Sequence, residues 1–126
     1  MIAPDITILY VDQPESSAQF YSRLLGIPPV ELSATFALWV GHNGFRLALW
    51  SKHSVQPAPA ASGGGGGGGG ELGFLCEQPE QVDALYRQWR DWQFEICQRP
   101  LQLAFGYSFV ACDPDGHRLR VYTLNR

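Results

Sequence analysis

The residues best suited to chemistry lie on two short segments with the same pattern. Residues 45–51 and 118–122 alternate leucine or valine with other side chains, which is typical of strands. The leucine and valine positions should face a helix, and the intervening positions should face a cleft: Arg46, Ala48 and Trp50 in the first segment, and Arg118, Arg120 and Tyr122 in the second. Guanidinium groups bind carboxylates, and aromatic rings stack on flat molecules. The pattern predicts a cleft that binds a planar aromatic compound bearing an acidic or polar group.

Both segments belong to an internal repeat. Residues 8–24 align with 73–89, where an acidic residue followed by Gln-Pro-Glu recurs. Residues 36–50 align with 108–122, which pairs Arg46 with Arg118. The chain therefore contains two copies of one unit.

Each copy shows the same succession of elements. An alternating strand, at 6–11 or 72–76, precedes a helix that begins near Pro14 or Pro79, because proline is tolerated in a first helical turn. Three strands follow, and a glycine turn joins the last two. This indicates an α+β fold with two tandem βαβββ units that form a curved mixed sheet around a cleft. The apolar stripes expected to pack on the sheet are Phe20, Leu24 and Leu25 in the first helix and Val82, Leu85, Tyr86 and Trp89 in the second.

A length of 126 residues fits one domain, 1–126, with a first unit at 1–55, a Pro/Gly-rich linker at 56–70 and a second unit at 71–126. The linker ends in eight glycines, Gly63 to Gly70. No Gly-Lys-Ser/Thr follows them and the next segment reads as a strand, so a phosphate-binding loop is not indicated.

Composition excludes several classes of function. The net charge is −3 and the nine Lys and Arg residues are dispersed, which does not favour nucleic-acid binding. No apolar run reaches the roughly 18 residues of a membrane span, and no signal peptide is evident, so we expect a cytoplasmic protein that does not bind membranes. Three cysteines, Cys76, Cys97 and Cys112, lack CxxC spacing and are expected to be free thiols.

The doubled unit, the Asp-Pro-Asp-Gly turn at 113–116 and the segment FYSRLLGI at 20–27 resemble the vicinal oxygen chelate superfamily over nearly the whole chain. This superfamily includes glyoxalase I, extradiol dioxygenases and bleomycin-resistance proteins. In metal-bearing members the ligands come from the first and last strands of each unit. The matching residues here are Ile6, Ala48, Glu71 and Arg120. Neither hydrocarbon side chains nor a guanidinium can coordinate a metal, so we expect no metal and no cofactor.

Among metal-free members the chain is similar to the subgroup of phenazine antibiotic resistance proteins, through ALWS at 48–51, FGYSF at 105–109 and DPDGH at 113–117. That resemblance implies a non-enzymatic protein that sequesters an antibiotic, with Trp50 stacking on it. It also implies a homodimer. Tyr107 departs from the subgroup, in which an arginine takes this place. The expected ligand-binding residues are Arg46, Ala48, Trp50, Glu71, Tyr107, Arg118, Arg120 and Tyr122, and no catalytic residue is expected.

Several alternatives stay open at this stage. Arg120 should either meet a ligand or pair with Glu71. Phe36 and Trp39 are separated by an odd interval, so only one can face the cleft. Trp89 and Trp92 fit core or interface packing better than ligand binding.

Two other functions compete with sequestration. One is a metal-dependent glyoxalase-like lyase or dioxygenase that uses ligands not identified above. The other is a metal-free enzyme or a ligand sensor, in which Tyr107 or His53 would act as acid or base. The three histidines, His42, His53 and His117, fall in or beside turns and are expected at the surface.

Overall fold

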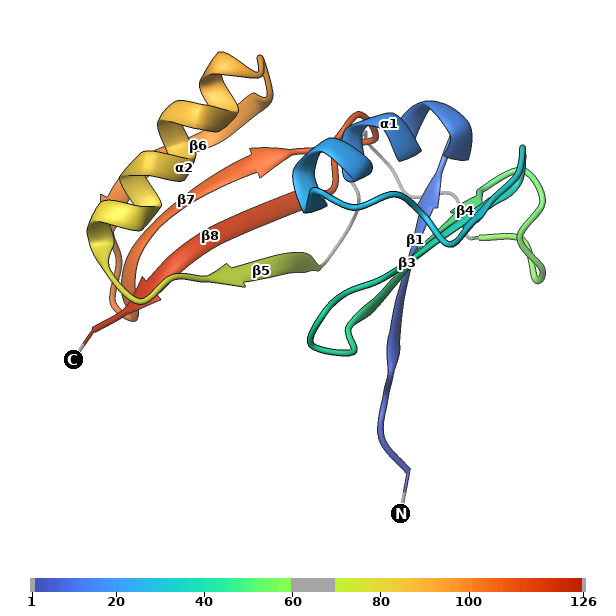
Figure 1. Cartoon of the computed structure of the whole chain (residues 1–126), viewed down its shortest axis with the longest axis horizontal. Coiled ribbons are helices and arrows are strands. Elements are labelled where there is room, and N and C mark those ends of the chain that lie inside the picture. Colours follow the sequence, from blue (N-terminus) through green and yellow to red (C-terminus); the bar gives the residue numbers. More distant parts are fainter. Residues whose placement is uncertain (1, 60–69, 126) are drawn as a thin grey trace. The chain divides into compact units, whose positions relative to one another are not determined.

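The computed structural model describes residues 2–59 and 70–125, which form two compact units, Met1–Gly64 and Gly65–Arg126 (Figure 1). The glycine tract predicted to be a linker lies outside the described residues, except for Gly70. No helix in the described ranges has the length and hydropathy needed to span a membrane.

The first unit has the predicted βαβββ order. Its elements are β1 (Ile6–Val11), α1 (Pro14–Leu25), β2 (Glu31–Leu32), β3 (Phe36–Val40) and β4 (Arg46–Ser51). The strands form one sheet in the order β1-β4-β3-β2, in which β1 runs parallel to β4 and the other pairs are antiparallel.

The second unit repeats this topology. Its elements are β5 (Glu71–Leu75), α2 (Pro79–Asp91), β6 (Glu95–Gln102), β7 (Gly106–Cys112) and β8 (Arg118–Leu124), with the strand order β5-β8-β7-β6. The prediction of two βαβββ units in an α+β fold is confirmed. Each unit has a four-stranded mixed sheet of its own.

The helices begin where the prolines predict. Both have proline in the first turn, and α2 adds a capping box in which Gln78 and Gln81 each bind the other's backbone N–H. Helix α1 ends at Gly26, whose φ of 71° places it in the left-handed region.

The packing face of α1 agrees only in part with the prediction. The buried residues are Pro14, Ser17, Ala18 and Tyr21, whereas Phe20, Leu24 and Leu25 are only half-buried. Small side chains at positions 17 and 18 allow the helix to approach the sheet closely, and Tyr21 supplies the bulk. Trp39 completes this core, since its indole Nε1 donates to Ser22 Oγ at 3.3 Å and its ring lies 6.0 Å from that of Tyr21.

The predicted face of α2 agrees with the structure. Val82 and Trp89 are buried, while Leu85 and Tyr86 are half-buried. The Trp89 ring contacts Phe74, Phe94 and Phe109 at centroid distances of 5.9, 5.7 and 5.3 Å, so it is a core residue. Trp92 packs on Phe94 at 5.5 Å.

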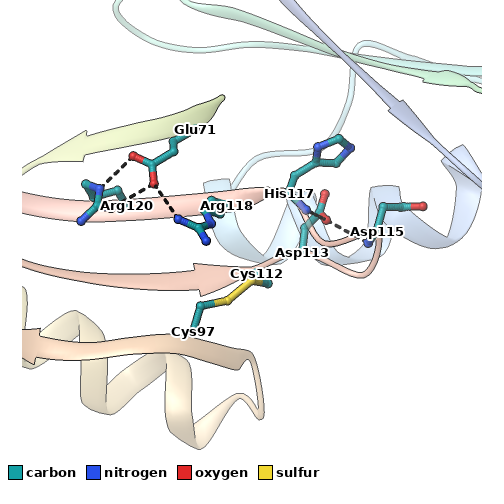
Figure 2. Close-up of a disulfide and its surroundings, with 8 residues drawn as sticks. All are labelled: Glu71, Cys97, Cys112, Asp113, Asp115, His117, Arg118 and Arg120. Carbon is teal, nitrogen blue, oxygen red and sulfur yellow. Dashed lines mark hydrogen bonds and ion pairs between the residues drawn. A yellow bond between two sulfur atoms is a disulfide. The ribbon is translucent and has the colours of Figure 1, made fainter. Parts of the chain in front are cut away.

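The prediction of three free thiols is also wrong, because Cys97 and Cys112 form a disulfide between β6 and β7 (Figure 2). The register of these strands shifts between Ile96 and Gln98, which leaves Cys97 as the extra residue of a bulge. The bulge brings the two Cα atoms within 6.3 Å. Sequence spacing cannot show a bulge, which is why the pairing was missed. Cys76 remains free.

Candidate functional site

The strand registers separate the two faces of each sheet. In the first unit, Trp39 donates a hydrogen bond to Ser22 on α1 and is the register partner of Leu47. Trp39 and Leu47 therefore lie on the face of the sheet that the helix covers. We call the opposite side the helix-distal face. In the first unit it carries Ile6, Ile8, Tyr10, Phe36, Leu38, Val40, Arg46, Ala48 and Trp50. In the second it carries Glu71, Gly73, Leu75, Ser108, Val110, Arg118, Arg120 and Tyr122.

An aromatic cluster, consisting of Tyr10, Phe36 and Trp50, occupies the helix-distal face of the first unit. The Phe36 and Trp50 rings meet edge to face, with centroids 6.3 Å apart. Tyr10 is the register partner of Trp50 on β1 and is 46% exposed. The open choice between Phe36 and Trp39 is thereby resolved, because Phe36 is beside Trp50 and Trp39 is in the core.

Sequence reasoning missed Tyr10 as a member of this cluster and left Phe36 open as an alternative to Trp39. Alternation alone places each of them on one of two faces without showing which one. The signal that was needed is the register, in which Trp50 lies between Tyr10 on β1 and Phe36 on β3.

The two other predicted residues of the first unit differ in their surroundings. Arg46 lies on the predicted face and forms an exposed ion pair with Asp5 at 3.6 Å. Such a pair contributes little to stability in water. Ala48 is fully buried, next to Leu38 in the register, so it can contribute shape but little contact area.

In the second unit, Arg120 pairs with Glu71, as one of the two alternatives predicted (Figure 2). Its Nε and Nη2 atoms donate to the two carboxylate oxygens at 2.8 and 3.0 Å, and Nη1 donates to Ser108 Oγ at 2.9 Å. This bidentate geometry is the strongest form of arginine–carboxylate contact. Arg118 approaches the same carboxylate at 4.0 Å.

Aromatic rings flank this ion pair. The Arg120 guanidinium lies 5.9 Å from the centroid of the Phe105 ring, and Phe105 meets Tyr122 edge to face at 6.1 Å. A side chain at Gly73 would crowd the Tyr122 ring, since a Cβ there would lie 3.3 Å from Cε1. The helix-distal face of the second unit thus combines two rings with two arginines and one carboxylate.

Tyr107 does not lie with the other predicted ligand-binding residues. It pairs in register with Thr123 and faces α2, where its hydroxyl donates to Asp83 Oδ1 at 2.7 Å. This hydrogen bond raises the pKa of Tyr107. Ser108, its neighbour, is the residue of the FGYSF segment that reaches the helix-distal face.

The other acid–base candidate, His53, lies at the surface of the first unit. Its Nε2 is 2.6 Å from Asp12 Oδ1, and both side chains are more than half exposed. The hydrogen bond to His53 lowers the pKa of Asp12. His53 follows β4 and is therefore beyond the strand that carries the aromatic cluster.

The Glu71–Arg120 pair should make stability depend on pH. The hydrogen bond from Arg120 lowers the pKa of Glu71 below its ordinary value of 4.5. A lowered folded-state pKa stabilises the fold above pH 4.5 and stops doing so as pH falls through the folded-state value. We expect Glu71→Gln to lower the free energy of unfolding at neutral pH, with a difference from the wild type that shrinks in acid. Urea unfolding across a pH series measures this.

Glu31→Gln, at an exposed position on β2, is the matched control and should show no such convergence. A Glu71→Gln deficit that is equally large at neutral and acid pH would contradict a role for the carboxylate charge.

The four positions that match metal ligands do not fit a metal. Ile6 and Ala48 offer hydrocarbon, Arg120 offers a cation, and Glu71 is already bound to Arg120. Within residues 2–59 and 70–125, no three His, Cys, Asp or Glu side chains are grouped so that they could hold a metal ion. These residues therefore support no metal-dependent step at this site.

Metal analysis of the purified protein tests this conclusion. Purified without chelator, it should contain less than about a tenth of an equivalent of nickel, zinc, iron or manganese, because three or four donor ligands are the norm for catalytic ions. A stoichiometric amount of any of these metals, lost together with an activity on dialysis against chelator, would restore the metal-enzyme alternative.

Comparison with known families agrees with this architecture. The model of the Glyoxalase/Bleomycin resistance protein/Dioxygenase superfamily matches residues 3–121. The chain belongs to this superfamily. The glyoxalase-like βαβββ duplication described above is accordingly the fold of a large group with diverse chemistry, and fold alone does not choose among its activities.

Known proteins that resemble this chain differ in their sequence identity to it. The chain is 28% identical to the phenazine antibiotic resistance protein EhpR of Enterobacter agglomerans, over 98% of this chain and 94% of that protein. It is 48% identical to protein ATC0852 from Agrobacterium tumefaciens, whose solution NMR structure it matches over the full length of both chains with a TM-score of 0.84. A glyoxalase/bleomycin resistance protein/dioxygenase from Nocardioides shares the fold, with 21% identity, a TM-score of 0.82 and coverage of 98% and 85%.

Proposed function

We propose that this protein binds a small planar aromatic compound without converting it, and that it acts in antibiotic resistance by sequestration. The observation that carries the proposal is the aromatic cluster on the helix-distal face, where Trp50 and Phe36 stand next to Tyr10. The similarity to EhpR, a phenazine antibiotic resistance protein, supports the class of ligand.

Stacking of the ligand on the aromatic rings should supply most of the binding affinity. The charge of Arg120 is matched by Glu71, and that of Arg46 by Asp5, so neither is an uncompensated anchor for an anion. Buried aromatic contacts contribute through both area and ring geometry.

The helix-distal face of the second unit has polar groups of its own that suit an acidic compound. The hydrogen bonds to Glu71 and Ser108 use three of the five N–H groups of the Arg120 guanidinium. Arg118, with a side chain that is 62% exposed, adds a second cation. Together these two arginines and one carboxylate leave one positive charge on this face of the second unit, which favours a single carboxylate there.

Calorimetric and fluorescence titrations test the proposal. Phenazine carboxylates should quench tryptophan fluorescence and release heat, whereas a saturated carboxylic acid of similar size should do neither. Absence of both signals across a broad panel of planar aromatic compounds would overturn it. Incubation with recovery of the unchanged compound separates binding from turnover.

We further propose that the protein acts as a homodimer. Large apolar side chains on the helix-distal face of the first unit are partly exposed, with Ile8 at 42% and Val40 at 43%. Tyr10, the next residue along this face of β1, is 46% exposed as well, and exposed apolar side chains grouped on one face are frequent at interfaces. Sedimentation should give twice the chain mass of 14.0 kDa, and a concentration-independent monomer would contradict this.

A further inference from the structure

A polar hollow in the second unit lies between α2 and the edge strand β6. It has a volume of about 530 Å³ and is lined by Tyr86, Arg90, Ile96, Cys97, Gln98 and Arg99. Tyr86 and Arg90 belong to α2, which covers the side of the sheet opposite to Arg120 and Tyr122, and β6 is the edge strand, so the hollow lies at the edge of the sheet. Its size falls in the range of small-molecule sites.

The residues that line the hollow include two arginines and no carboxylate. Arg90 and Arg99 are both exposed, and no aspartate or glutamate is among the lining residues. Neither arginine takes part in a salt bridge within the described ranges. The Arg90 guanidinium lies over the Tyr86 ring at 5.4 Å, a contact that limits where the charge can move. Two arginines that face one hollow favour an anion with several acceptor oxygens.

Gln98 provides a second, independent indication. Its side-chain Oε1 is buried and has no hydrogen-bond partner in the described part of the chain. Leaving a buried acceptor without a hydrogen bond is unfavourable, because the group loses its contact with water and gains nothing in return. Gln98 pairs in register with Val110, so its side chain leaves the edge strand on the helix-distal side. The amide gains a hydrogen-bond partner if it turns around the edge of the sheet toward a polar occupant of the hollow. Bulges on both sides of Gln98, where the β6–β7 register shifts, give β6 an irregular course at this point.

We propose that this hollow is a binding site for a small oxyanion that also carries a hydroxyl group, such as hydrogen phosphate or a phosphate monoester. The acceptor oxygens of the anion pair with Arg90 and Arg99, and its hydroxyl meets the Gln98 amide. Cys97 and Ile96 form the wall on the β6 side.

The test is a titration of the whole protein with inorganic phosphate, followed by two-dimensional NMR at constant ionic strength. Backbone resonances of Tyr86, Gln98 and Arg99 should shift in a saturable manner. The double variant Arg90→Gln/Arg99→Gln should bind at least about tenfold more weakly, since loss of two charge-assisted contacts exceeds the 1.4 kcal/mol that corresponds to tenfold. Gln98→Leu should retain the arginine contacts and lose a smaller factor.

Arg87→Gln is the matched control, because Arg87 is an exposed arginine on α2 outside the hollow. It should bind phosphate as the wild type does. Equal weakening by Arg87→Gln and by the double variant, or equal shifts on addition of chloride, would overturn the site. Unchanged resonances at saturating phosphate would overturn it as well. Trp50→Ala should leave phosphate binding intact, so this test does not depend on the proposed aromatic ligand.

Discussion

Trp50→Ala is expected to weaken binding of a phenazine carboxylate by about thirtyfold, which corresponds to the roughly 2 kcal/mol typical of an aromatic hot spot. Trp50 lies between Phe36 and Tyr10, so its removal opens the centre of the aromatic cluster. Because the Trp50 side chain is only half-buried, folding should persist. Calorimetry gives the affinity, and thermal unfolding verifies the fold.

Two further substitutions are the controls for this experiment. Trp50→Phe keeps a stacking ring and should restore most of the affinity. Trp92→Phe changes a tryptophan that packs on Phe94 at the end of α2, and should leave affinity unchanged. If the folded Trp50→Ala protein bound the compound with wild-type affinity, the aromatic cluster would not be part of the binding site.

Gly106→Ala is expected to destabilise the second unit by about 3 kcal/mol or more, at the upper end of the cost of overpacking. A Cβ at this buried position would overlap the carbonyl oxygen of Thr123 and lie 3.0 Å from the Cα of Leu124. Both obstacles are backbone atoms of β8, so relief requires β7 and β8 to separate. Urea unfolding measures the loss.

Gly70→Ala is the control for the general effect of adding a methyl group, because nothing lies within 4 Å of a Cβ there. It should change the free energy of unfolding by less than about 1 kcal/mol. If Gly106→Ala proved no more destabilising than Gly70→Ala, the result would contradict the close approach of β7 to β8 at this position.

The sequence was most informative where local rules determine structure. The prolines at positions 14 and 79 predict both helix starts, and the repeat predicts the βαβββ order of each unit. Alternation places Arg46, Trp50, Arg120 and Tyr122 on the faces where the structure has them. These features depend on backbone periodicity, which is visible in a single sequence.

The errors have a common physical cause, since each depends on contacts between distant segments. Tyr107 was assigned to the ligand because of its place in a motif, but its alternation with Ser108 directs it toward Asp83 on α2. The Cys97–Cys112 disulfide requires a bulge in β6. The α1 face depends on how closely small residues let the helix approach the sheet, which an apolar count does not measure.

The Glu71–Arg120 pair has a consequence for how the second unit folds. Glu71 is on β5 and Arg120 is on β8, which are neighbouring strands of one sheet although the two residues are far apart in the sequence. The ion pair can therefore form only after the chain has passed through α2, β6 and β7 and brought its last strand back beside β5. It ties the beginning of the second unit to its end, so this contact reports on completion of the whole unit.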